Sequence, residues 1–163
     1  LIEKPLDLVG ASATVGVNKT NDPLLPARGV KAEYSGRFRQ GLGNDQRFWS
    51  HYATLALYQS FRLPARVTWA VRAGVGHNTG RYAFNLAQVL DGKTELRGFR
   101  KTRFYGDSKV FFNNEVRVKL ASFRSYLFPA SLGVLGFYDT GRVWYADAQG
   151  QDPSAADGKS SRW

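Results

Sequence analysis

The chain has no cysteine, no methionine and only two histidines, His51 and His77. The absence of cysteine excludes disulfide bonds and thiolate metal sites. Two histidines are too few for a usual zinc site, so we interpret both as isolated strand or loop residues and expect no metal and no cofactor. Since position 1 is not methionine and no signal peptide is visible, we expect the chain to be processed or trimmed.

Long apolar runs are also missing: no stretch approaches the roughly 18 residues that a transmembrane helix needs. This does not exclude a membrane, because the alternating strands of a barrel leave only a weak hydropathy signal. Aromatic residues make up 14% of the chain and glycine contributes 17 of its 163 residues, a composition that favours strands and turns. The length suits one domain or part of a larger one.

The net charge is +10, from 23 Lys and Arg against 13 Asp and Glu. Such a surface attracts nucleic acid, anionic lipid headgroups and the phosphates of lipopolysaccharide. The hydrophobic pattern has a period of two almost throughout, as in strands with one apolar and one polar face. It predicts six strands, at approximately residues 7–18, 29–40, 48–63, 67–77, 109–122 and 131–145, with a long loop over 78–108.

These segments are longer than most strands of soluble sheets and suit a tilted membrane crossing. Their connections alternate between short and long, which predicts a periplasmic side with short turns, including 21–29, and an extracellular side with long loops. Several aromatic residues fall near predicted strand ends, where aromatic girdles form: Trp49, Tyr52, Tyr126, Phe128, Trp144 and Tyr145. The sequence therefore predicts an all-β protein, an antiparallel transmembrane β-barrel. Six strands are too few to close a barrel, so we expect residues 1–163 to form part of the wall.

Arg97 lies in the long loop, within the string Leu96-Arg97-Gly98-Phe99. A guanidinium stays charged and requires acceptors opposite its planar fork. Glu115 and Asp139 fall on the inward face of two later strands, which predicts a loop that folds into the barrel and pairs with them. Gly98 would allow a tight backbone and a close approach to the wall. The alternative is an exposed basic loop with unrelated carboxylates.

The chain resembles the BamA-type barrel proteins of outer membranes, also called the bacterial surface antigen family. The resemblance is carried by three motifs in order: Leu96-Arg97-Gly98-Phe99, Asn113-Asn114-Glu115 and Phe137-Tyr138-Asp139-Thr140-Gly141. It implies that the chain covers roughly the eighth to thirteenth strands of a sixteen-stranded barrel. It also implies a structural set of residues that holds the loop in the lumen: Arg97, Gly98, Phe99, Glu115, Asp139 and Gly141.

The resemblance implies a non-enzymatic protein of the Gram-negative outer membrane that inserts or translocates other proteins. The implied partners are outer-membrane lipid, lipopolysaccharide and unfolded outer-membrane proteins, with accessory lipoproteins or a fused periplasmic domain. Arg100, Lys101 and Arg103 could contact lipopolysaccharide phosphates, although we favour a solvated loop face.

Two other functions remain open. One is a barrel that anchors and exports a fused enzyme such as a phosphoesterase, since Arg103-Phe104-Tyr105-Gly106 resembles a branch with that arrangement. The other is a soluble basic β-barrel that binds nucleic acid. The continuous apolar face of the strands argues against the soluble protein, and we expect no nucleic-acid partner.

Overall fold

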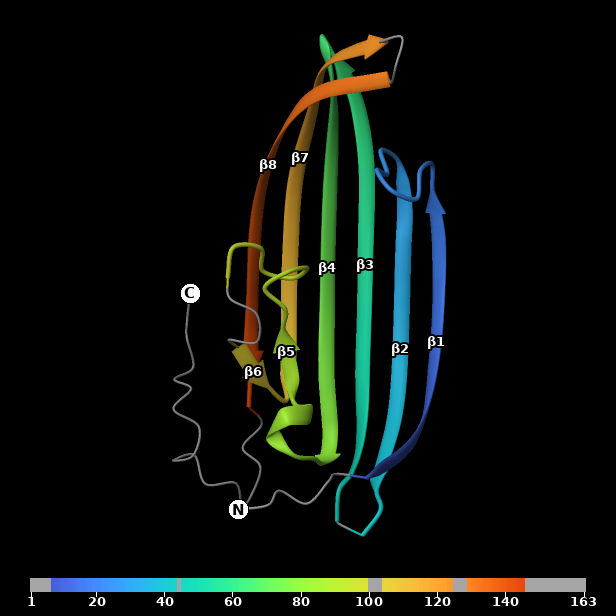
Figure 1. The fold of residues 1–163 in the computed structure, drawn as a ribbon, viewed down its shortest axis with the longest axis vertical. Coiled ribbons are helices and arrows are strands. Elements are labelled where there is room, and N and C mark those ends of the chain that lie inside the picture. Colours follow the sequence, from blue (N-terminus) through green and yellow to red (C-terminus); the bar gives the residue numbers. More distant parts are fainter. Residues whose placement is uncertain (1–6, 44, 100–103, 125–128, 146–163) are drawn as a thin grey trace.

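The computed structural model describes residues 7–43, 45–99, 104–124 and 129–145. They form an antiparallel sheet of six long strands in the order β1-β2-β3-β4-β7-β8 (Figure 1). The strands are β1 (Leu8–Thr20), β2 (Gly29–Gly41), β3 (Arg47–Leu63), β4 (Ala65–Arg81), β7 (Ser108–Arg124) and β8 (Pro129–Trp144). The all-β, antiparallel class predicted from the sequence is confirmed.

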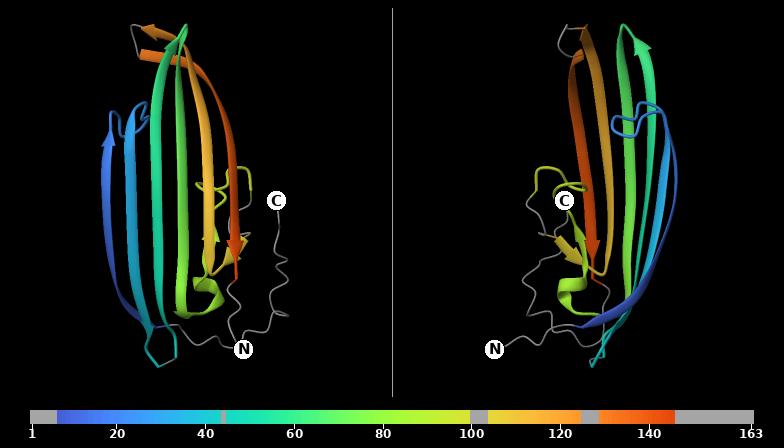
Figure 2. Two further views of the ribbon diagram at one scale, coloured as in Figure 1. Left: turned by 180° about the vertical axis from the view of Figure 1, so that it is seen from behind. Right: turned by 45° about the vertical axis from the view of Figure 1, so that its right-hand side comes forward.

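Every long strand pairs with the next one along the sheet, so the chain runs as a simple meander. The segment between β4 and β7 carries a short 3-10 helix, η1 (Phe84–Leu86), and a two-stranded sheet of β5 (Gln88–Leu90) and β6 (Phe104–Gly106). This segment packs against one face of β4, β7 and β8, and Figure 2 shows it to one side of the curved sheet. We call that face the inner face and the opposite one the outer face.

The strands extend beyond the alternating pattern that predicts them. The strand expected over 67–77 runs over Ala65–Arg81, and its hairpin partner β3 pairs with it from Leu63↔Ala65 to Arg47↔Arg81. Backbone pairing therefore continues through polar positions, where the hydrophobic alternation has already ended. The connection that follows is correspondingly shorter than the expected 78–108 loop and begins after Arg81.

The two faces of the sheet differ as the sequence predicts. On the inner face, Thr68 is opposite Arg117 and Arg72 is opposite Asn113. On the outer face, large apolar side chains remain exposed along all six long strands, including Val15, Leu57, Trp69, Val116 and Val134. A continuous exposed apolar face of this kind marks a surface that contacts an apolar environment or a partner. Among the described residues, no helix is long and apolar enough to cross a membrane.

A small hydrophobic core lies between the inner face and the β4–β7 connection. Leu90, Leu96 and Phe111 are buried there. Room for it comes partly from glycine: a Cβ added at Gly74 would lie 2.3 Å from Cε1 of Phe111. Tyr52 packs against this core, so its assignment to an aromatic girdle was wrong. The strand position was right, but the ring lies on the inner side. Tyr126 and Phe128 lie outside the described residues.

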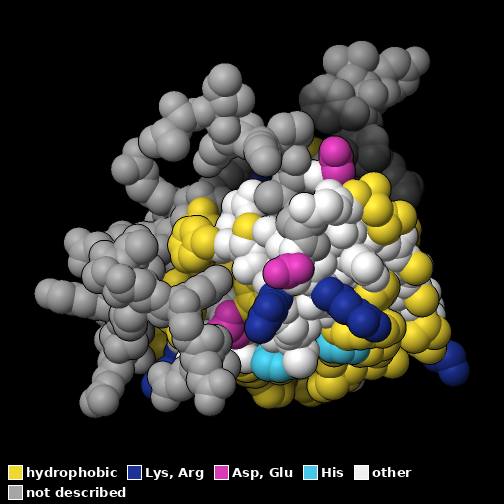
Figure 3. Space-filling view, turned by 90° about the horizontal axis from the view of Figure 1, so that it is seen from below, with side chains coloured by type: hydrophobic (Ala, Val, Ile, Leu, Met, Phe, Trp, Pro, Cys, Tyr) yellow, Lys and Arg dark blue, Asp and Glu magenta, His cyan; other side chains and the backbone are white. Residues whose placement is uncertain are grey.

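The two histidines are not isolated, contrary to the sequence-based interpretation. His51 is directly opposite His77 in the β3–β4 pair. The ring of His51 stacks on Trp49 with centroids 6.2 Å apart, and His77 Nδ1 lies 2.7 Å from Oγ of Ser108. In Figure 3 both histidines lie beside a band of hydrophobic side chains. The described residues contain no group of three or more side chains that could hold a metal ion.

Candidate functional site

The candidate site lies where residues 91–99 cross the inner face of β7 and β8. Asp91 organises this segment locally: its carbonyl accepts hydrogen bonds from the backbone N–H groups of Glu95 (2.9 Å) and Leu96 (3.0 Å). Its side chain accepts from Lys93 N–H at 3.1 Å and from the Thr94 hydroxyl at 2.9 Å. Such local side-chain bonds favour a turn, and this turn presents Glu95 and Arg97 to the sheet.

Arg97 contacts both carboxylates that the sequence pattern pairs with it. Its Nε and Nη2 donate to Asp139 Oδ2 and Oδ1 at 2.8 and 2.9 Å, a bidentate arrangement. Its Nη1 donates to Glu115 Oε2, and its backbone N–H donates to Asp139 Oδ2 at 3.0 Å. The guanidinium carbon also lies 4.2 Å from the ring centroid of Phe137. We call Arg97, Glu115 and Asp139 the Arg97 anchor.

Burial makes removal of one partner of the Arg97 anchor costlier than removal of one partner of a surface ion pair, because a buried charge would be left uncompensated. The side chain of Asp139 is 3% exposed and that of Glu115 is 10% exposed, whereas Arg97 retains 29%. Glu115 is shared, because Arg117 also donates to it. The hydrogen bonds to Asp139 raise the pKa of Arg97 above its already high usual value. The Arg97 guanidinium therefore stays positively charged at physiological pH.

The other predicted residues have different roles. Gly98 adopts φ +93°, a conformation that favours glycine, but a Cβ there would have nothing within 4 Å. The positive φ agrees with the expected special backbone conformation, and the adjacent backbone N–H of Arg97 contacts Asp139 on β8, but the space around Gly98 itself is open. At Gly141 the approach is close: a Cβ would lie 3.1 Å from Leu90 Cδ1. Phe99 packs edge-on against Phe104, with centroids 5.8 Å apart.

A second cluster, which sequence reasoning missed, fixes the same turn two residues earlier. Lys109 Nζ donates to both carboxylate oxygens of Glu95, at 2.7 and 3.0 Å, and the Tyr52 hydroxyl donates to Glu95 Oε1 at 2.9 Å. Asn113 adds a bond of 2.7 Å from its side-chain amide to the Glu95 carbonyl. Both ionic partners are buried, with side chains 8% and 4% exposed. We call Glu95, Lys109 and Tyr52 the Glu95 anchor.

A sequence signal for the Glu95 anchor did exist. Lys109 shares the inward face of its strand with Asn113 and Glu115, so it is a cation on the inner side without an obvious partner in the sequence. Glu95 immediately precedes the Leu96-Arg97-Gly98-Phe99 string and supplies the opposite charge. Arg72 on β4 also holds the turn: it donates to the Thr94 carbonyl and, at 3.1 Å, to Asn113 Oδ1. Arg100, Lys101 and Arg103 lie outside the described residues.

The Omp85 superfamily domain model matches residues 3–163, almost the whole chain. The chain belongs to the Omp85 superfamily. The BamA-type resemblance is therefore confirmed at the level of the family. Omp85 is an outer-membrane family whose members insert or translocate proteins, which agrees with a β-rich chain that has an apolar outer face. A search of the curated proteins finds no match to the chain.

In this Omp85 chain the two anchors hold one turn on the sheet through opposite charges. Every ionised group named in them has a counter-charge within hydrogen-bonding distance. Such an arrangement suits a structural role, because groups engaged in this way are held in place rather than offered to a ligand. Beside it, Phe99, Leu96 and Asp139 help to line a small cavity of about 130 Å³.

Proposed function

We propose that this Omp85 chain is part of a non-enzymatic transmembrane β-barrel of the bacterial outer membrane that inserts or translocates other outer-membrane proteins. The observation that carries the proposal is the Arg97 anchor. The family motif residue contacts carboxylates on two adjacent strands, within a chain whose family has this function. In this reading the anchored turn lies in the lumen and stiffens the wall at β7 and β8.

The proposed environment follows from the two faces. The outer face carries the exposed apolar side chains, which suits contact with outer-membrane lipid and lipopolysaccharide acyl chains. The inner face carries ion pairs and hydrogen bonds, which suits a wet lumen. The 21–28 turn and the Pro64 hairpin lie at the top in Figure 1 and would be periplasmic, while the 82–107 connection would be extracellular. Unfolded outer-membrane proteins are the proposed clients, with accessory lipoproteins or a fused periplasmic domain as further partners.

The proposed mechanism is physical rather than chemical. A barrel of this kind perturbs the bilayer and offers strand edges, and a client strand joins such an edge by β-augmentation. The anchored turn contributes by keeping β4, β7 and β8 in fixed relative positions while other parts of the barrel open. Because β7 and β8 pair over almost their full length, the wall beneath the turn would remain closed during client insertion.

Reconstitution tests the proposal. The full-length protein is placed in liposomes, a urea-denatured small β-barrel protein is added, and folding is followed by heat-modifiable gel mobility. We expect the client to fold faster than in empty liposomes, and we expect Arg97→Glu to remove most of this acceleration. Arg37→Glu is the matched control, because it makes the same change of charge and Arg37 belongs to β2 and is not part of either anchor.

Two outcomes would contradict the proposal. Client folding at the rate seen in empty liposomes would exclude an insertion role. Full acceleration by Arg97→Glu would show that the Arg97 anchor does not serve that role. The alternative of a barrel that anchors a fused enzyme predicts no client acceleration and a hydrolytic activity in the full-length protein, so the same preparation distinguishes the two.

A further inference from the structure

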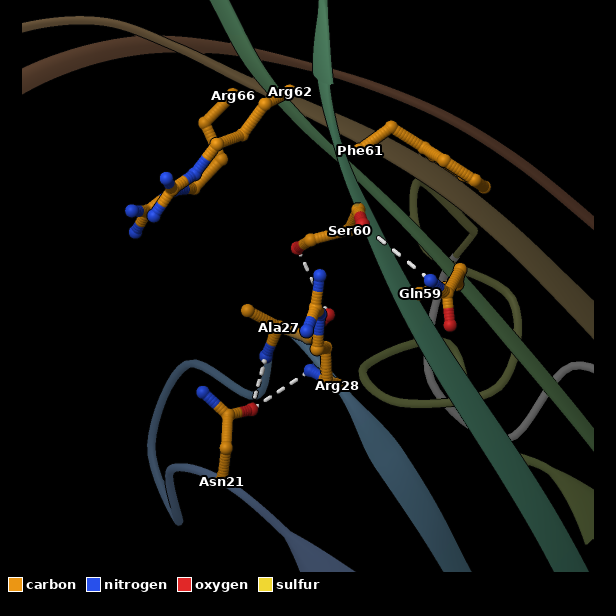
Figure 4. A pocket seen from close by; sticks show the side chains of 8 residues that line it. All are labelled: Asn21, Ala27, Arg28, Gln59, Ser60, Phe61, Arg62 and Arg66. Carbon is orange, nitrogen blue, oxygen red and sulfur yellow. Dashed lines mark hydrogen bonds between the residues drawn. The ribbon is translucent and has the colours of Figure 1, made fainter.

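A basic pocket lies at the other end of the inner face from the long connection. It has a volume of about 790 Å³ and is formed where the 21–28 turn meets the β3–β4 hairpin (Figure 4). Its lining consists of Asn21, Ala27, Arg28, Gln59, Ser60, Phe61, Arg62 and Arg66. The volume falls in the range of ordinary ligand sites.

Three cations stand in a row across neighbouring strands at this end of the sheet. Arg62 on β3 is directly opposite Arg66 on β4, and Arg66 is directly opposite Lys119 on β7. In Figure 4 the side chains of Arg62 and Arg66 run side by side, and Arg28 enters the same space from the 21–28 turn. Register partners share a face, so the row lies on the inner side together with Ser60 and Thr68.

The wall beside these cations is built by specific hydrogen bonds. Asn21 Oδ1 accepts from the backbone N–H groups of Ala27 (2.9 Å) and Arg28 (2.7 Å). The Ser60 hydroxyl donates to the Ala27 carbonyl at 2.9 Å and lies 2.7 Å from the Thr68 hydroxyl. The turn that carries Arg28 is thereby fixed to β3, and the position of Arg28 relative to Arg62 does not depend on a free loop.

Neither the three cations of the row nor Arg28 forms an ion pair within the described part of the chain. Each carboxylate in an ion pair there serves Arg97, Arg117 or Lys109, and none serves Arg28, Arg62 or Arg66. Like charges directly opposite each other on adjacent strands destabilise a sheet. An anion that binds between them relieves this repulsion, and two neighbouring guanidinium forks match the geometry of carboxylates.

We propose that this pocket binds an acidic segment of a polypeptide, through carboxylates that pair with Arg62, Arg66 and Arg28. Arg62 and Arg66 lie on the inner face, whereas the apolar outer face is the one suited to lipid, so a lipid headgroup is the less suitable anion. The choice of a polypeptide rests on the proposed function, in which this end of the sheet is periplasmic and unfolded outer-membrane proteins are the clients. The pocket would then hold an acidic stretch of a client at the mouth of the barrel.

The test measures binding of a fluorescein-labelled peptide of alternating Glu and Ser to the full-length protein in nanodiscs, by anisotropy. A peptide with Gln in place of Glu is the reference. We expect the Glu peptide to bind at least about a hundredfold tighter, and the double variant Arg62→Gln/Arg66→Gln to lose about a hundredfold in affinity, since each of the two arginines supplies one charge-assisted contact worth about tenfold. The double variant Arg62→Lys/Arg66→Lys keeps the positive charges but lacks the planar guanidinium groups. We expect its affinity for the Glu peptide to lie between those of the wild type and the Gln double variant.

The matched control is Arg37→Gln/Arg39→Gln, which removes the same charge from the inner face of β2. Arg37 is opposite Ser50, which lies roughly 40 Å from Arg62 along β3 at about 3.3 Å per residue. We expect this control to change the affinity less than about twofold. Equal binding of the Glu and Gln peptides, or equal losses in the two double variants, would overturn the proposal. Heat-modifiable mobility verifies that each variant is folded.

Failure of this inference and failure of the proposed function give different results in the same preparation. A wild-type protein that accelerates client folding but does not prefer the Glu peptide contradicts only the pocket. A protein that prefers the Glu peptide but does not accelerate client folding leaves the pocket in place and contradicts the insertion role. If the Glu peptide loses its binding when the nanodisc contains anionic lipid, whereas replacing Glu by Gln in the peptide has no effect, the pocket binds lipid headgroups and the proposal is wrong.

Discussion

Replacing Arg97 by alanine removes three side-chain hydrogen bonds and leaves two carboxylates without their shared cation. The cost falls mainly on Asp139, because Glu115 retains Arg117. Removing one partner of a buried ion pair costs about 3–5 kcal/mol. Since 29% of the Arg97 side chain is exposed, we take the lower end, about 3 kcal/mol. This corresponds to a shift of about 150-fold in the equilibrium between the docked and released turn.

Hydrogen exchange of residues 90–99 in the full-length protein measures this shift. We expect exchange in Arg97→Ala to accelerate by about two orders of magnitude there, and to stay unchanged in β1 and β2. Arg97→Glu should release the turn further, and adding Asp139→Arg should restore part of the protection, because an ion pair of reversed polarity forms. An acceleration below about fivefold in Arg97→Ala, or no recovery in the double variant, would refute the reasoning.

Three further predictions concern other parts of the same framework. Glu95→Gln leaves Lys109 as a buried cation without its carboxylate, and we expect about 3 kcal/mol loss of turn protection by hydrogen exchange. Gly98→Ala should cost about 1–2 kcal/mol from its positive φ alone, whereas Gly74→Ala should also displace Phe111 and lower the thermal midpoint more. Backbone N–H groups of Leu25 and Leu24 hold the pKa of Asp22 below its usual value. The contribution of Asp22 to stability is therefore fully present above that usual value and is lost as pH falls towards and through the lowered pKa of the folded state. Proteolysis of the 21–28 turn should therefore rise below about pH 4 in the wild type, and Asp22→Asn should lack this acid dependence.

The strands and the Arg97 anchor could be predicted from the sequence, because both depend on which residues share a face of a strand. Alternation with a period of two decides which residues share a face, so Glu115 and Asp139 could be placed on the same side without knowing the register. The ends of the strands could not be found in this way, since pairing at positions such as Asn78 and Thr79 depends on the partner strand rather than on hydrophobicity. Tyr52 was assigned to a girdle because it lies near a predicted strand end, although it has the parity of Ser50 and Thr54 on the inner face.

The Glu95 anchor was missed for a different physical reason. A loop has no parity, and the path of residues 91–96 is determined by the bonds within the Asp91 turn and by the burial of Leu96. Neither can be read from spacing. The same reasoning explains Gly98, where the sequence indicated a special backbone conformation but not whether the space around it was full or empty.

The order of charges in the turn has one more consequence. Glu95 and Arg97 carry opposite signs, and the sheet presents Lys109 and then Glu115 in the matching order along β7. If the turn shifted along β7 by one anchor position, Glu95 would face Glu115, or Arg97 would face Lys109. Attraction would become repulsion in either direction. The two ion pairs therefore favour a single register of the turn on β7. A turn that is released from the sheet is expected to dock again in that same register.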